Sequence, residues 1–108
     1  METWKNRKTE DLIEILLRLK TKQEMRNFLR DLLTEKEILE LGNRWKAVQM
    51  LDAKKLYIEI IRETGLSSTT IARISQWLKN GLGGYRLALG RISKNHHKTS
   101  SSSGKRLM

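Results

Sequence analysis

The residues best suited to chemistry form one polar run over positions 67–76. They lie on the outer face of a helix expected over 68–80, or just before it: Ser67, Ser68, Thr69, Thr70, Arg73 and Gln76. Short hydroxyls and helix N-terminal amides suit phosphate oxygens, whereas Arg bonds the edge of guanine and Gln the edge of adenine in the major groove. The pattern therefore favours contact with double-stranded DNA and predicts no enzyme.

Two short helices must position this polar face. Gly65 follows a helix expected over 56–64, and glycine can adopt the positive φ that a tight turn between two helices requires. Ser67 is suited to cap the helix that follows. Apolar residues occur at the spacing that the inner faces need: Ile60, Leu66, Ile71 and Ile74. Together these features predict a helix-turn-helix over about 56–80.

Three further cations precede or accompany the first of these helices. Lys54, Lys55 and Arg62 are placed where they can contact the phosphate backbone of a duplex. An ordinary helical hairpin with a solvated polar face fits the same pattern. The fifth residue of a helix-turn-helix is usually small, but it is Ile61 in this chain. This bulky residue favours the ordinary hairpin over a DNA-binding helix-turn-helix.

Composition limits the classes of partner and of fold. The chain has 108 residues with 22 Lys and Arg against 12 Asp and Glu, a formal net charge of +10 that favours a polyanionic partner. It contains neither cysteine nor proline, which excludes disulfides and thiolate-bound metals and suits an all-α fold. No apolar run is long enough to span a membrane, and the first ten residues lack a signal-peptide core. We therefore expect a cytoplasmic protein with no membrane partner.

Helix-start signals divide the chain into segments. Thr9 is a candidate cap for a first helix, and the spacings Thr21 to Glu24 and Thr34 to Glu37 are typical of capping boxes. The pattern predicts a loose lead-in over 1–8, one helical domain over 9–94 with no boundary inside 9–92, and a disordered basic tail over 95–108.

Several strings resemble the Trp repressor family and, within it, the YerC/YecD group. The resemblance covers residues from about 10 to 92 and is carried by strings that include Leu33-Thr34-Glu35-Lys36-Glu37, Leu41-Gly42-Asn43-Arg44, Glu63-Thr64-Gly65 and Gly83-Gly84-Tyr85-Arg86. This resemblance implies a Trp repressor-like, intertwined homodimer whose two recognition helices, 68–80, enter successive major grooves. It also implies a bacterial transcriptional regulator, which we interpret as a sequence-specific repressor.

The resemblance also bears on a small-molecule effector. Arg44 and Arg73 match the two arginines that flank the indole of tryptophan in the Trp repressor. Ile74 and Trp77 match positions at which the Trp repressor carries small residues near the ligand. Their greater bulk would crowd the pocket, so we predict that no tryptophan corepressor binds. We expect Trp77 to lie in the core, and the alternative is that its own ring fills the indole space.

The remaining candidates favour simpler interpretations. His96 and His97 lie in the polar tail without further ligands, so we expect no metal and no cofactor. Glu59 and Glu63 are expected to form a solvated ion-pair face.

The alternative function is a basic helical dimer that binds an acidic protein or RNA. Membrane-surface association is disfavoured because the apolar stripes are needed for a core.

Overall fold

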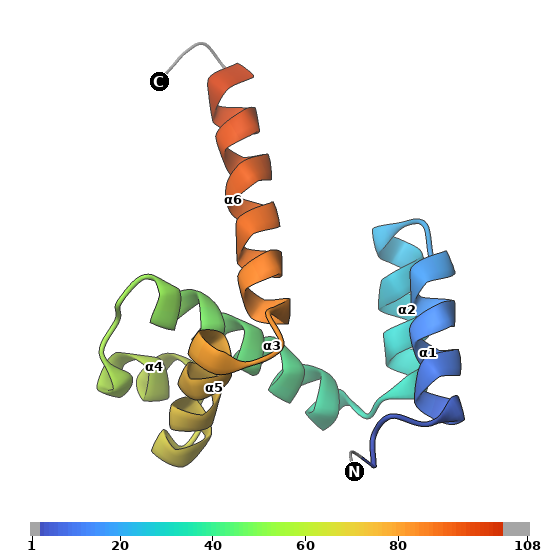
Figure 1. Ribbon diagram of the computed structural model, residues 1–108, viewed down its shortest axis with the longest axis horizontal. Helices are drawn as coiled ribbons and strands as arrows, with labels where there is room; N and C mark the ends of the chain where they lie inside the picture. Colours follow the sequence, from blue (N-terminus) through green and yellow to red (C-terminus); the bar gives the residue numbers. More distant parts are fainter. Residues whose placement is uncertain (1–2, 103–108) are drawn as a thin grey trace. The chain divides into compact units, whose positions relative to one another are not determined.

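In a computed structural model, the chain is described over residues 3–102, with side chains described over 3–93. Within 3–102 it forms six helices and no strand (Figure 1): α1 (Arg7–Arg18), α2 (Lys22–Leu32), α3 (Glu35–Asp52), α4 (Tyr57–Thr64), α5 (Ser68–Asn80) and α6 (Gly84–Ser102). The all-α prediction is confirmed. Over that same stretch, none of the helices has both the length and the apolar character needed to cross a membrane.

The chain divides into two compact units, Met1–Glu40 and Leu41–Met108. The sequence showed no boundary inside 9–92, because the helical pattern of α3 runs across the division. Unit 1 holds α1, α2 and the start of α3, and neither α1 nor α2 contains a buried residue. Unit 2 holds the rest of α3 with α4, α5 and α6.

The first helix begins earlier than its sequence predicted. Asn6, not Thr9, is its N-cap, and the Asn6 side chain accepts a hydrogen bond from the Thr9 backbone N–H at 3.0 Å. Asn is at least as good a cap as Thr, and Arg7 and Lys8 are compatible with a helix, so the helix extends two residues into the expected lead-in. The prediction that Thr9 caps the first helix is therefore wrong.

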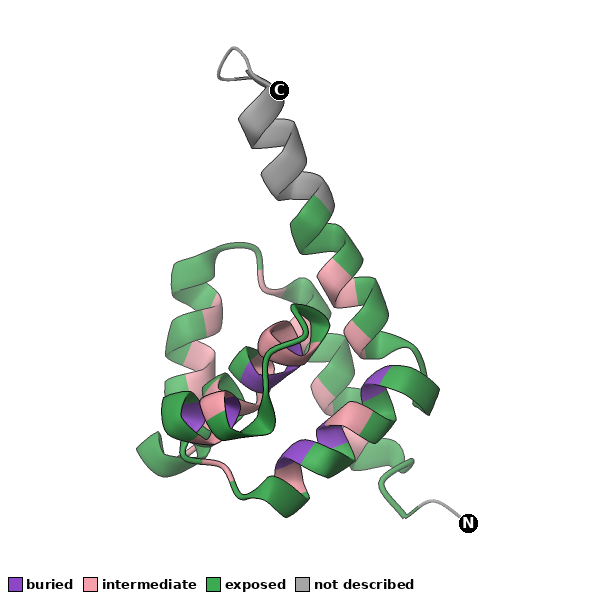
Figure 2. Cartoon of the chain, turned by 90° about the vertical axis from the view of Figure 1, so that its left-hand side faces the viewer, coloured by how far each residue is buried: buried purple, intermediate pink, exposed green. Residues whose placement is uncertain are grey.

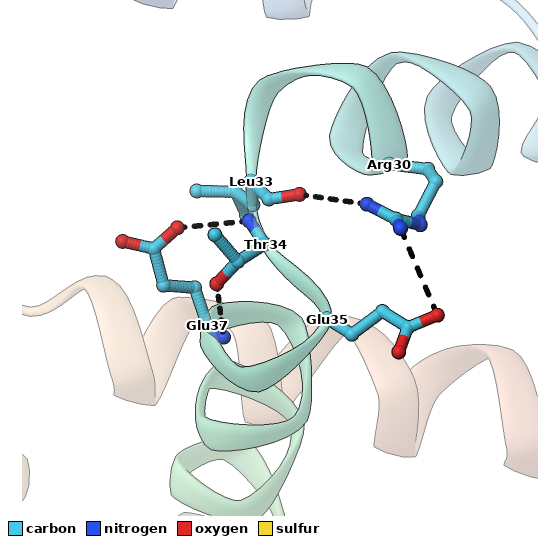
Figure 3. A network of polar contacts seen from close by, with 5 residues as sticks. All are labelled: Arg30, Leu33, Thr34, Glu35 and Glu37. Atoms are coloured by element: carbon cyan, nitrogen blue, oxygen red, sulfur yellow. Dashed lines mark hydrogen bonds and ion pairs between the residues drawn. The ribbon is translucent and has the colours of Figure 1, made fainter.

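Of the two predicted capping boxes in unit 1, the one at Thr34 is complete and the one at Thr21 is half formed (Figure 3 shows the complete one). Thr34 Oγ1 accepts from the Glu37 N–H at 3.1 Å, while Glu37 Oε1 accepts from the Thr34 N–H at 2.9 Å. Thr21 likewise caps α2 by accepting from the Glu24 N–H at 3.0 Å. The Glu24 carboxylate, however, accepts from the N–H of Lys20 rather than from that of Thr21.

Arg30 supports the connection between α2 and α3. Its guanidinium donates to the Leu33 carbonyl oxygen at 3.2 Å and lies 3.7 Å from the Glu35 carboxylate. The ion pair is exposed, so its own contribution is small. The bond to Leu33 satisfies one of the carbonyl groups that a helix C-terminus leaves unpaired.

The core of unit 2 lies where α3, α4 and α5 meet (Figure 2). Its buried members are Ala47, Val48, Ile60, Ile71, Ile74 and Leu78. Leu66 and Ile61 pack against this cluster as half-buried residues. The predicted inner-face residues of the two helices are therefore confirmed, and the bulky Ile61 is accommodated at the edge of the core.

The connection from α3 to α4 closes with a Schellman motif. The Lys55 N–H donates to the Met50 carbonyl and the Lys54 N–H to the Leu51 carbonyl, both at 3.0 Å. Lys54 itself has φ of 64°, the one positive φ among the non-glycine residues that the structure describes. This position usually belongs to glycine, because a Cβ is disfavoured there.

Replacing Lys54 with glycine is expected to stabilise the fold. Lys54→Gly should raise the free energy of unfolding by about 1 kcal/mol, because glycine adopts positive φ without the steric cost of a Cβ. Urea unfolding followed by circular dichroism measures the change. The matched control is Lys55→Gly, whose backbone does not have positive φ. A higher free energy of unfolding in both variants, or no increase in Lys54→Gly, would contradict a steric cost at Lys54.

The last helix, α6, extends beyond residue 94, where the sequence predicted the helical domain to end. Its backbone is helical from Gly84 to Ser102, because the segment after Ile92 contains no helix-breaking residue before Gly104. The tail predicted over 95–108 therefore overlaps this helix up to residue 102. Its remainder, together with the side chains of His96 and His97, lies outside the residues that the structure describes.

Candidate nucleic-acid interface

The turn between α4 and α5 is built on Gly65. Its φ is 74°, in the left-handed region, and its N–H donates to the Ile61 carbonyl at 2.8 Å. Thr64 is buried, donates its hydroxyl to the Ile60 carbonyl at 2.7 Å and accepts from the Leu66 N–H at 3.2 Å. The hydroxyl of Thr64 thus joins the end of α4 to the turn.

The start of α5 is held by hydroxyl groups. Ser67 Oγ accepts from the Thr70 N–H at 3.1 Å and donates to Thr70 Oγ1 at 3.0 Å. The predicted cap by Ser67 is confirmed. These bonds orient Thr70 and fix the first turn of α5, whose free amides point out of the helix end.

Loss of this cap is expected to cost stability. Ser67→Ala should lower the free energy of unfolding by about 1 kcal/mol, because the Thr70 amide loses its acceptor. Ser68→Ala is the matched control, since Ser68 is the next residue, is also exposed and does not cap the helix. Thermal or urea unfolding of both variants measures the difference, and equal losses would refute the assignment of Ser67 as the cap.

The outer face of α5 presents the predicted polar residues to solvent. Ser68, Thr69, Arg73 and Gln76 are exposed, and Thr70 is half-buried. They face outward because the opposite stripe of α5, residues Ile71, Ile74 and Leu78, is packed in the core. The structure therefore places Thr69, Arg73 and Gln76 on one exposed surface of α5, with Ser68 and Thr70 at its flanks.

The other predicted cations lie on neighbouring elements. Lys54 and Lys55 are exposed in the α3–α4 connection, and both line a cavity of about 310 Å³ in unit 2. Arg62 is exposed in the last turn of α4 and does not belong to the lining of that cavity. The structure thus brings the two lysines together and places Arg62 apart from their cavity.

Glu59 has a different role from the predicted ion-pair face. Its carboxylate accepts a hydrogen bond from the Leu56 N–H at 2.9 Å, so it closes the start of α4. Over residues 3–93, no group of three or more His, Cys, Asp or Glu side chains is placed to hold a metal ion.

The residues predicted for an effector pocket differ in burial. Arg44 is half-buried on α3, and Arg73 is exposed on α5. Ile74 is fully buried, whereas Trp77 is 47% exposed. The prediction that Trp77 lies in the core of the chain is therefore wrong. Leu78, not Trp77, continues the stripe of Ile71 and Ile74, since residues four and seven apart share one helix face.

Comparison with known proteins identifies the family of this arrangement. Residues 7–93 match the family described as Trp repressor protein. The chain belongs to the Trp repressor family. It is 33% identical over 97 residues to an uncharacterised Bacillus subtilis protein, YerC, covering 90% of this chain and 93% of that one. The structure of a TrpR-like protein from Eubacterium eligens superposes with a TM-score of 0.78 at 33% identity, covering 83% of this chain and 93% of that one.

Membership in the Trp repressor family confirms the resemblance seen in the sequence. The family has a regulatory DNA-binding fold. In that fold, α4 and α5 occupy the segment for which the sequence predicted the helix-turn-helix.

Sequence reasoning missed Thr64, although a hydroxyl residue directly before the turn glycine was a usable signal. It also missed Lys79 and Arg86, which share the cavity with Lys54 and Lys55.

Proposed function

We propose that this chain is a sequence-specific regulator of transcription, acting as a repressor on bacterial chromosomal DNA in the cytoplasm. The observation that carries the proposal is the outward face of α5, where Arg73 and Gln76 follow an N-terminal turn rich in hydroxyls. Arg73 donates to guanine, and Gln76 pairs with adenine. The hydroxyls of the first turn and its free amides bind phosphate oxygens.

The proposal includes a homodimer. In unit 1 several large apolar side chains are exposed although α1 and α2 are regular helices: Ile13, Ile15, Leu17, Leu32 and Leu39. Exposed apolar area on this scale favours a second copy of the chain as its cover. Light scattering at micromolar concentration should report twice the chain mass of 12.6 kDa. A stable monomer would contradict the dimer.

A salt titration tests the choice of nucleic acid. The full chain should bind a duplex selected from random DNA more tightly than a single-stranded RNA of equal length, with log affinity falling linearly with log salt concentration. Sequence preference among duplexes should persist at physiological salt. Preference for the RNA, or equal binding to all duplexes, would favour the alternative of a basic interaction module.

The proposed regulator takes no tryptophan corepressor. The support is the side-chain bulk at Ile74 and Trp77, positions at which the Trp repressor carries small residues. Isothermal titration with L-tryptophan should give no heat of binding at micromolar concentration. Binding in that range would restore Arg44 and Arg73 as an effector site.

A further inference from the structure

Unit 2 contains a concentration of positively charged side chains beside the last half of α5. A cavity of about 310 Å³ is lined by side chains from the end of α3, the α3–α4 connection, α4, the last half of α5 and the first turn of α6. Its cationic lining comprises Lys54, Lys55, Lys79 and Arg86, against one carboxylate, that of Asp52. Figure 1 shows the helices that contribute.

The lining has the chemistry of an anion site. Tyr57 and Ser75 add hydroxyl groups to the four cations, and Leu78 supplies a buried apolar wall. A hollow lined mainly by one sign of charge concentrates counter-ions. Arg and Lys are the side chains that bind phosphate groups in proteins. A volume of about 300 Å³ is at the lower end of small-molecule sites.

The backbone of Lys54 is an independent observation. Lys54 keeps a positive φ at a position where glycine would be free of steric cost. A strained non-glycine residue of this kind suggests that its side chain is needed where it lies. That side chain is one of the four cations of the cavity.

We propose that this cavity binds a small anion carrying two or more phosphate groups. The concave shape of the cavity favours a small molecule over the DNA backbone, which Lys54 and Lys55 were also predicted to contact. Lys79 and Ser68 are separated by about 17 Å along the axis of α5, at 1.5 Å per residue. Lys79 therefore lies far from the hydroxyls of the first turn, although it is only one turn beyond Gln76. A concave site also encloses a free phosphate compound better than a phosphate on a wide duplex.

Isothermal titration of the full chain with inorganic pyrophosphate, at fixed ionic strength, tests the site. Wild-type protein should give a saturable heat of binding. The variant Lys79→Gln/Arg86→Gln should weaken binding at least about tenfold, because it removes half of the cationic lining. The matched control, Lys46→Gln/Arg91→Gln, removes the same charge from exposed positions outside the cavity. It should stay within about twofold of wild type.

The possible results distinguish a specific anion site from non-specific attraction by the positive charge of the whole chain, and from a contact with DNA. Equal weakening in both double variants, or no pyrophosphate binding by wild type, would overturn the proposal. So would a Lys79→Gln/Arg86→Gln protein that binds pyrophosphate as wild type does but loses affinity for the selected duplex, since these cations would then contact DNA. Circular dichroism checks that each variant folds. If the double variant does not fold, Lys55→Gln replaces it with the same expected direction.

Discussion

Arg73→Ala is expected to weaken binding to a preferred duplex by about 1–3 kcal/mol, a loss of roughly 5- to 150-fold in affinity. Arg73 is exposed on the outer face of α5, so its removal leaves the buried stripe of that helix unchanged. A guanidinium can donate two parallel bonds to guanine, and alanine can make neither. Discrimination at one base pair should therefore relax together with the affinity.

The measurement compares two duplexes and two variants. Fluorescence anisotropy at several salt concentrations should be run with a duplex selected by the wild-type protein and with a scrambled duplex of equal length. Arg91→Ala is the matched control, because it removes the same exposed side chain from α6. It should change both affinities slightly and equally. If Arg73→Ala binds the selected duplex as tightly as wild type does, the assignment of α5 as the recognition helix is wrong.

Ile60→Ala is expected to lower the free energy of unfolding by about 2–5 kcal/mol. Ile60 is fully buried in α4, within the core formed with α3 and α5. The substitution removes buried apolar surface and leaves a cavity that close-packed neighbours fill only partly. Since small domains are stable by about 5–15 kcal/mol, this single change should remove a large share of the total.

Ile58→Ala provides a matched control on the same helix. Ile58 is 57% exposed, and it undergoes the same substitution with the same change in helix propensity. Urea unfolding at one fixed protein concentration should show a loss several times smaller than that of Ile60→Ala. Similar losses at the two positions would mean that Ile58 is covered in the assembled protein, and would require a revised interface.

Local signals in the sequence determined most helix ends. A threonine followed three residues later by glutamate predicted the starts of α2 and α3, and Gly65 with Ser67 predicted the turn between α4 and α5. These signals succeed because a cap or a turn glycine acts through hydrogen bonds within a few residues of itself. The first helix was misplaced because two good capping residues, Asn6 and Thr9, compete over the same few positions.

Which side chains face the core was only partly determined by the sequence. The stripe of Ile60, Ile71 and Ile74 followed from helical periodicity, and so did the outward position of Arg73. Trp77 was misassigned because Trp77 and Leu78 both lie at a helical spacing from Ile74. Only the packing of α5 against its neighbours selects Leu78 for the interior.

The convergence of cations was decided by the tertiary structure alone. Lys54 and Lys55 were visible as a pair, but Lys79 and Arg86 are far from them in the sequence and lie on two other helices. Periodicity and capping describe one helix at a time, whereas a shared cavity depends on how several helices pack. The sequence by itself therefore determined the family, most helix ends and the polar face of α5. The fold decided which distant side chains share one site.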